Sequence, residues 1–175
     1  SDDKWGFFDE ITRQGMLYVR NEKMLLFFAR TISSYGWFEP GWIYCLYDAK
    51  NGANVIRSLI RVCSEKVNEW AKGLKKGMKI NGSEVRDTLE ALLCFTRVRL
   101  KDPTILDPND NEVKLLIWNI EDIAVILQTN PDVFACESGT DTKSSYKPRV
   151  HFPGEDCSKS LMLPTVLALR NALRG

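Results

Sequence analysis

The sequence predicts an all-α fold, a compact bundle of five to seven helices with a long irregular loop near the C-terminal end. Apolar residues recur at spacings of three and four along several long stretches, which is the period of an amphipathic helix. Only Ile43–Tyr47 has the composition of a strand, and no second convincing strand is available to pair with it. The 175 residues include 44% hydrophobic and 27% charged side chains, typical of a folded globule. We therefore expect one helical domain over residues 1–175.

The N-terminal third is expected to contain two helices and a turn. Trp5–Arg20 has helical periodicity, and Gly15 is expected to interrupt or end that helix. Glu22–Ser34 is a stronger helix, with Gly36 as its stop signal. Tyr35–Trp42 is rich in rings, glycine and proline, which favours a turn. For Ile43–Tyr47 we favour a short helix over a strand.

The segment from Asn54 to Lys76 has the most sharply divided surface of any predicted helix. Its apolar side chains from Val55 to Leu74 gather on one side of a helical wheel. That side is expected to pack in the core, which leaves the opposite side free to meet an anion. The opposite side carries Arg57, Arg61, Lys72, Lys75 and Lys76.

The C-terminal half is expected to contain three helices and the long loop. Glu84–Leu100 follows Ser83, a plausible N-cap residue. It is apolar on two sides, so we expect it to be interior. Glu112–Gln128 is the most apolar helix, and we place it at the centre of the fold. Residues 129–159 carry prolines, glycines and a Ser/Thr-rich run, as expected of a loop that is functional or disordered. Ser160–Arg174 closes the chain as a helix with Pro164 near its first turn.

Any electrostatic function must come from local clusters, because the net charge is only +1. The basic side of Asn54–Lys76, together with Arg97 and Arg99, predicts phosphate contact without base recognition, with RNA or an acidic membrane surface as partner. The alternative is a solvated face on which Glu65 and Glu69 balance the cations. The predicted anion-binding set is Arg57, Arg61, Lys72, Lys75, Lys76, Arg97 and Arg99.

Aromatic side chains between the second and third predicted helices form a candidate partner-binding site. Trp37, Phe38 and Trp42 are interleaved with Gly and Pro, an arrangement that can stack bases or hold a proline-rich peptide. The alternative is a loop whose rings are anchored in the core.

The cysteine pattern favours a reducing compartment, the cytoplasm or the nucleus. Five scattered cysteines do not suggest a disulfide framework. His151 and Cys157 offer a base and a nucleophile for an enzyme without a recognisable motif, but their spacing fits no closed zinc pattern. We therefore expect no metal site and no cofactor. No apolar run approaches the ~20 residues that span a bilayer, so we expect no transmembrane segment.

These observations predict a non-enzymatic interaction or assembly domain. The surplus of apolar helix surface and the absence of catalytic motifs favour a protein partner or self-association. A structural protein of the viral matrix or nucleocapsid-associated type would suit a nearly neutral chain with local basic patches. RNA binding through the basic helix face is one alternative. An enzyme with a site around His151 and Cys157 is the other.

Overall fold

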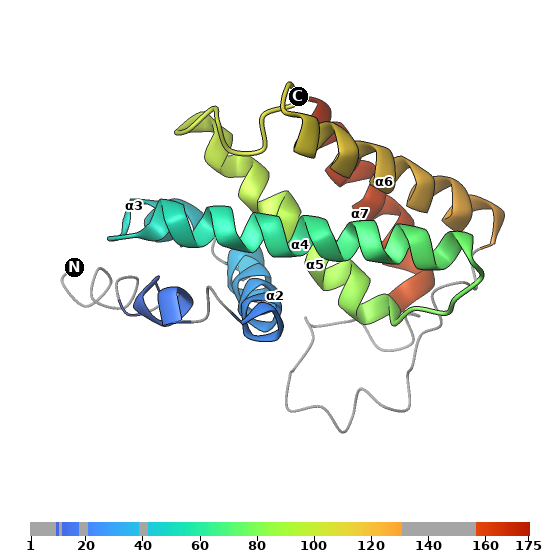
Figure 1. Cartoon of the computed structure of the whole chain (residues 1–175), viewed down its shortest axis with the longest axis horizontal. Helices are drawn as coiled ribbons and strands as arrows, with labels where there is room; N and C mark the ends of the chain where they lie inside the picture. Colours follow the sequence, from blue (N-terminus) through green and yellow to red (C-terminus); the bar gives the residue numbers. More distant parts are fainter. Residues whose placement is uncertain (1–9, 11, 18–20, 39–41, 131–156) are drawn as a thin grey trace.

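The computed structural model describes residue 10 and residues 12–17, 21–38, 42–130 and 157–175. Every regular element in these residues is helical, which confirms the predicted all-α bundle (Figure 1). Residues 12–17 form a first helical turn. The helices that follow are α2 (Glu22–Phe38), α3 (Trp42–Asp48), α4 (Gly52–Lys75), α5 (Gly82–Thr96), the short 3-10 helix η1 (Arg97–Leu100), α6 (Asn111–Thr129) and α7 (Cys157–Arg174).

Two glycines that were expected to end helices lie inside them. Helical backbone continues through Gly15 to residue 17, and α2 continues through Gly36 to Phe38. A β-carbon at Gly15 would lie 2.7 Å from Val55 Cγ1 and 2.9 Å from Phe28 Cε1. Gly15 therefore allows the N-terminal turn to pack closely on α2 and α4. The predicted turn over Tyr35–Trp42 is wrong at both ends, because α2 continues to Phe38 and α3 begins at Trp42. A single glycine such as Gly36 costs a helix only about 1 kcal/mol, so it does not have to end one.

The start of α4 depends on a close contact with α3. Ile43–Tyr47 lies within α3, which confirms the helical interpretation of that segment. Asn51 adopts a left-handed conformation with φ of 64°, and α4 begins at Gly52. A β-carbon at Gly52 would lie only 1.9 Å from the carbonyl oxygen of Leu46, so no larger residue fits there. The long helix predicted over Asn54–Lys76 is otherwise confirmed by α4.

The centre of the bundle is α5, as its two apolar sides indicated, whereas α6 is less central than its apolar composition suggested. Every residue from Val85 to Leu89 is buried, so α5 is covered on all its sides, and it packs against α2, α4 and α7. In contrast, α6 packs against α4 and α7 and leaves three large apolar side chains exposed. Those exposed side chains are Leu115, Trp118 and Val125.

The ends of two C-terminal helices also differ from the predictions. Asn81, not Ser83, caps α5, because its side-chain oxygen accepts hydrogen bonds from the backbone amides of Ser83 and Glu84 at 3.0 and 3.3 Å. The helix α7 begins at Cys157 and contains Pro164 in its interior. Most of the predicted loop, residues 131–156, lies outside the described residues.

Candidate functional site

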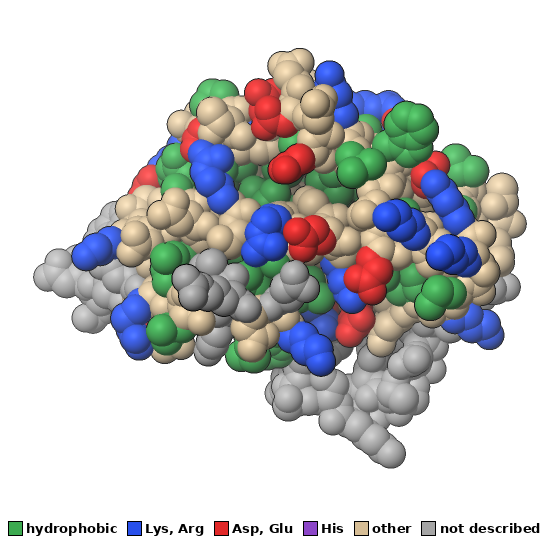
Figure 2. All heavy atoms as spheres, in the orientation of Figure 1, with side chains coloured by type: hydrophobic (Ala, Val, Ile, Leu, Met, Phe, Trp, Pro, Cys, Tyr) green, Lys and Arg blue, Asp and Glu red, His purple; other side chains and the backbone are tan. Residues whose placement is uncertain are grey.

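A cavity of about 380 Å³ opens between α4 and α6, where the segment that joins η1 to α6 closes one end. Figure 2 shows this face of the molecule, with hydrophobic side chains in the hollow and charged side chains around it. The volume lies within the range of about 300–1,000 Å³ that is typical of binding pockets. The lining residues are Arg57, Ile60, Arg61, Ser64, Glu65, Asn68, Thr104, Ile105, Leu106, Asp110, Glu112, Val113, Leu115, Leu116 and Asn119.

The wall from α4 presents polar side chains at helical spacing. Arg57, Arg61, Ser64 and Asn68 recur every three or four residues and therefore share one side of the helix. Across the cavity on α6, the buried Asn119 donates a hydrogen bond from Nδ2 to Asn68 Oδ1 at 3.2 Å. This amide pair links the two helices. It also places polar groups beside an otherwise apolar floor.

The segment between η1 and α6 is held in place by Arg99. The guanidinium of Arg99 donates to the carbonyl oxygens of Ile105 and Leu106 in this segment, and to those of Ala172 and Leu173 near the end of α7. Burial lowers the pKa of Arg99, and the Asp107 carboxylate opposes that shift. The guanidinium donors of Arg99 are therefore used by backbone carbonyls within the protein, and in this arrangement they do not face a bound anion.

Leu106, in the floor of the cavity, has an unusual backbone conformation. Its φ is 52°, in the left-handed region, which costs a non-glycine residue roughly 1–2 kcal/mol. The hydrogen bond from Arg99 to its carbonyl oxygen helps to hold this conformation. The Leu106 side chain is 3% exposed, so the strained backbone directs a leucine into the core beneath the cavity.

Asp102 organises the polar end of the same segment. Its carboxylate accepts hydrogen bonds from the Thr104 hydroxyl at 2.5 Å, and from the Tyr47 hydroxyl and the Arg57 guanidinium, both at 2.9 Å. The Thr104 hydroxyl makes the largest contribution to a lowered pKa of Asp102. Burial opposes this shift, and the bonds from Tyr47 and from the Thr104 amide reinforce it. The bond to Asp102 in turn raises the pKa of Tyr47.

We expect Thr104→Val to raise the pKa of Asp102 toward its ordinary value, because the strongest stabiliser of the carboxylate is removed. The folded-state pKa lies below the unfolded-state value of about 3.9. The stabilisation by Asp102 is therefore fully present above that pH and is lost as the pH falls through the folded-state pKa. Carbon NMR titration of the Asp102 carboxyl measures the change. Thr129→Val is the control, because the Thr129 hydroxyl bonds only to carbonyls of α6. An unchanged titration in Thr104→Val would contradict this account.

Three members of the predicted anion-binding set form ion pairs. Arg57 lies 2.9 Å from Asp102, Arg61 lies 3.3 Å from Glu65, and Lys75 lies 2.6 Å from Asp122 on α6. The first two pairs border the cavity, and the third joins α4 to α6. These pairs compensate much of the positive charge that the sequence suggested for this face.

The remaining cations of the set do not converge on one place. Lys72 and Lys76 are exposed near the end of α4, and Lys72 lies about 22 Å along the helix axis from Arg57 at 1.5 Å per residue. Arg97 is exposed at the start of η1. The predicted set therefore separates into two arginines beside the cavity, a lysine group at the far end of α4, and Arg97 and Arg99 in η1.

Several predicted site residues lie outside what the structure describes. The backbones of Trp37 and Phe38 belong to α2 and that of Trp42 begins α3, but their side chains are not described. His151 is outside the described residues, and the side chain of Cys157 is too. The partner-binding role of the rings and the enzyme hypothesis both stay predictions.

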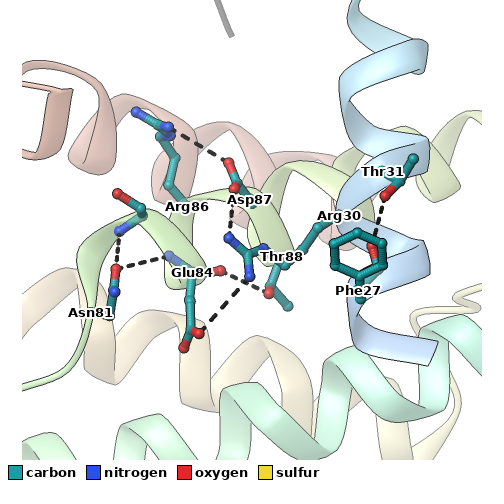
Figure 3. A network of polar contacts seen from close by, with 9 residues as sticks. Phe27, Arg30, Thr31, Asn81, Glu84, Arg86, Asp87 and Thr88 are labelled. Atoms are coloured by element: carbon teal, nitrogen blue, oxygen red, sulfur yellow. Dashed lines mark hydrogen bonds and ion pairs between the residues drawn. The ribbon is translucent and has the colours of Figure 1, made fainter. Parts of the chain in front are cut away.

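A second polar cluster joins α2 to α5 on another side of the bundle (Figure 3). Arg30 reaches from α2 to Asp87, at 3.3 Å, and to Glu84, at 3.9 Å. Arg86 lies 3.6 Å from the other oxygen of Asp87. Arg86 and Asp87 are 2% and 3% exposed, so the α5 part of this cluster is interior. The contact from Arg30 to Asp87 links α2 to α5.

The exposed side of α6 is the feature that sequence reasoning missed. Leu115, Trp118 and Val125 were assigned to an interior helix, but their exposed fractions are 54%, 66% and 58%. At 100° per residue they lie within about 80° of one another, so they form one stripe. We call these three residues the α6 stripe. Leu115 also lines the cavity, which makes the stripe and the cavity neighbours on one face.

Comparison with protein-family models, curated proteins and solved structures finds no significant match to this chain. In the part of the chain that the structure describes, no group of three or more His, Cys, Asp or Glu side chains could hold a metal ion. The described helices also include none with the length and hydropathy to cross a bilayer. We therefore infer the function from the geometry of the face formed by α4 and α6.

Proposed function

We propose that this chain is an interaction domain that assembles with copies of itself through the α6 stripe. The observation that carries the proposal is the exposure of Leu115, Trp118 and Val125, each more than half exposed, along one side of one helix. Single exposed apolar residues are common on protein surfaces. A row of them rimmed by polar residues, beside a cavity with an apolar floor, is typical of an interaction site.

The energetics favour an interface centred on Trp118. Full burial of a large apolar side chain contributes about 1.5–3 kcal/mol, and the stripe holds three. Tryptophan is among the residues that most often dominate binding energy at interfaces. The net charge of +1 adds little repulsion between identical copies.

We expect Trp118→Glu to prevent self-association, because it places a charge at the centre of the proposed apolar contact. Size-exclusion chromatography with light scattering, over a range of concentrations, measures the mass. The unmodified chain is expected to move from 20.0 kDa toward twice that mass as concentration rises, while the variant stays at 20.0 kDa. Leu100→Glu is the matched control, because Leu100 is a large apolar residue with 86% exposure outside α6. A chain that stays monomeric at the highest attainable concentration would overturn the proposal.

Phosphate binding is a second candidate, favoured by the lysines at the end of α4. Lys72, Lys76 and Lys79 are exposed, and no ion pair with a carboxylate occupies them among the described residues. Lysines near a helix C-terminus also complement the helix dipole, which explains two of them without a ligand. This patch supports a weak, sequence-independent contact with RNA.

If the patch binds RNA, affinity for a single-stranded oligonucleotide should fall with salt at a log–log slope of about −2 for three phosphate contacts. The double variant Lys72→Glu with Lys76→Glu is expected to abolish that salt-sensitive binding. Lys114→Glu reverses an exposed lysine on α6 and serves as the charge control. Fluorescence anisotropy at two salt concentrations provides the measurement. Binding that is equal in both variants would exclude this patch.

A further inference from the structure

We propose that the cavity between α4 and α6 receives the Trp118 side chain of a second copy of this chain. The inference rests on the proposed self-association and specifies the contact that produces it. Each copy carries both an exposed indole and a cavity with an apolar floor. In a pair of copies, the indole of each copy can therefore enter the cavity of the other.

The cavity floor suits a large planar ring. Ile60, Ile105, Leu106, Val113 and Leu116 supply apolar surface from α4, from the segment after η1, and from α6. The cavity volume of about 380 Å³ is in the range that holds a small organic group. An indole that enters it would leave water and bury part of the 150–250 Å² that an aromatic side chain covers when enclosed.

The polar wall offers partners for the one polar atom of the indole. A buried tryptophan N–H usually finds a hydrogen-bond acceptor. Ser64, Asn68 and Asn119 lie in the lining and carry a hydroxyl and two amide groups. The bond from Asn119 Nδ2 to Asn68 Oδ1 holds two of these groups in place.

The position of Trp118 beside the cavity fits a two-fold interface. In such an interface a protrusion on each copy must face a recess on the other, and both must lie on the same patch. Leu115 lines the cavity and Trp118 lies one helical turn farther along α6. A second copy turned by half a rotation can thus place its Trp118 over the cavity of the first.

The charges around the cavity permit contact between identical faces. The lining contains Arg57 and Arg61 and the carboxylates of Glu65, Asp110 and Glu112, so positive and negative groups nearly balance. Identical copies would therefore meet without strong like-charge repulsion, which a one-sign rim would cause. A small-molecule ligand or a different protein is the competing occupant.

The test is fluorine NMR of the full chain labelled with 5-fluorotryptophan. The Trp118 resonance is the one that disappears in Trp118→Phe. A soluble paramagnetic agent reports access to the ring. As the protein concentration rises through the assembly transition measured by light scattering, we expect the Trp118 resonance to shift. We also expect the agent to broaden it less, because the ring becomes buried. A dimer in which Trp118 stays accessible overturns the cavity contact but retains self-association. A strict monomer overturns both.

A cavity-filling variant provides an independent measurement. Ser64→Phe introduces a ring into the lining and is expected to weaken dimerisation at least tenfold, while Ser58→Phe, on the same helix outside the lining, retains it. Thermal unfolding of both variants confirms that they are folded. Dimerisation of Ser64→Phe with the affinity of the unmodified chain would overturn the proposal. If Ser64→Phe does not fold, the protection of Trp118 in the unmodified chain decides the question.

Discussion

Asp87→Ala is expected to lower the free energy of unfolding by about 3–5 kcal/mol, the usual cost of removing one partner from a buried ion pair. Asp87 is 3% exposed and lies within 3.6 Å of Arg86 and 3.3 Å of Arg30. Its removal takes a carboxylate away from the interior, where both Arg86 and Arg30 contact it. Urea denaturation monitored by circular dichroism measures the loss.

Two matched variants separate charge from packing in this cluster. Glu84→Ala removes a carboxylate that is 42% exposed and lies 3.9 Å from Arg30, so its effect is expected to be less than about 1 kcal/mol. Replacing both buried charges, as Arg86→Met with Asp87→Leu, is expected to cost less than Asp87→Ala alone. If Asp87→Ala is no worse than Glu84→Ala, the contact between Arg30 and Asp87 does not hold α2 on α5.

Arg99→Ala is expected to lower the free energy of unfolding by about 3 kcal/mol or more. Hydrogen bonds that involve a charged group contribute about 1.5–3 kcal/mol each, and their effects at one side chain do not add fully. Arg99 donates to carbonyls in two separate segments, before α6 and at the end of α7. Its loss removes the guanidinium donors from these carbonyls, although the Ala172 carbonyl still accepts from the Gly175 amide, and it releases the segment that closes one end of the cavity.

Arg99→Lys tests whether stability depends on the several donors of the planar guanidinium or on its positive charge alone. A lysine keeps the charge, but its single ammonium group cannot replace a planar guanidinium that spans two segments. We therefore expect Arg99→Lys to recover only a minor part of the lost stability. Arg97→Ala changes an exposed arginine two residues away and should stay within about 0.5 kcal/mol of the unmodified chain. Equal stability of Arg99→Ala and Arg97→Ala would contradict the structural role of Arg99.

The helices of this protein could be predicted because helical periodicity is local. The apolar residues of α4 from Val55 to Leu74 repeat at the helical period, and the structure buries most of that side. Glycine residues predicted the ends of helices less reliably. Gly15 and Gly36 lie inside helices, since tertiary packing outweighs a propensity cost of about 1 kcal/mol.

The candidate site could be predicted only in part. Arg57 and Arg61 were singled out by their spacing, and both line the cavity. The partner of Arg61, Glu65, could be predicted because it lies one turn away along α4. The partner of Arg57, Asp102, could not be predicted because it lies 45 residues away in the sequence. The role of Arg99 was also inaccessible, because its acceptors near the end of α7 lie more than 70 residues away.

Periodicity alone thus determined that the chain is helical, where most helices lie and which side of α4 is apolar. The apolar pattern also indicated that α5 is interior, but only the tertiary structure decided that α6, the most apolar helix by composition, keeps one side open. The physical reason is that hydrophobicity measures the gain from burial but does not identify the neighbour that provides it. For Leu115, Trp118 and Val125 no neighbour within the described residues covers the stripe, and a second copy is the partner we propose.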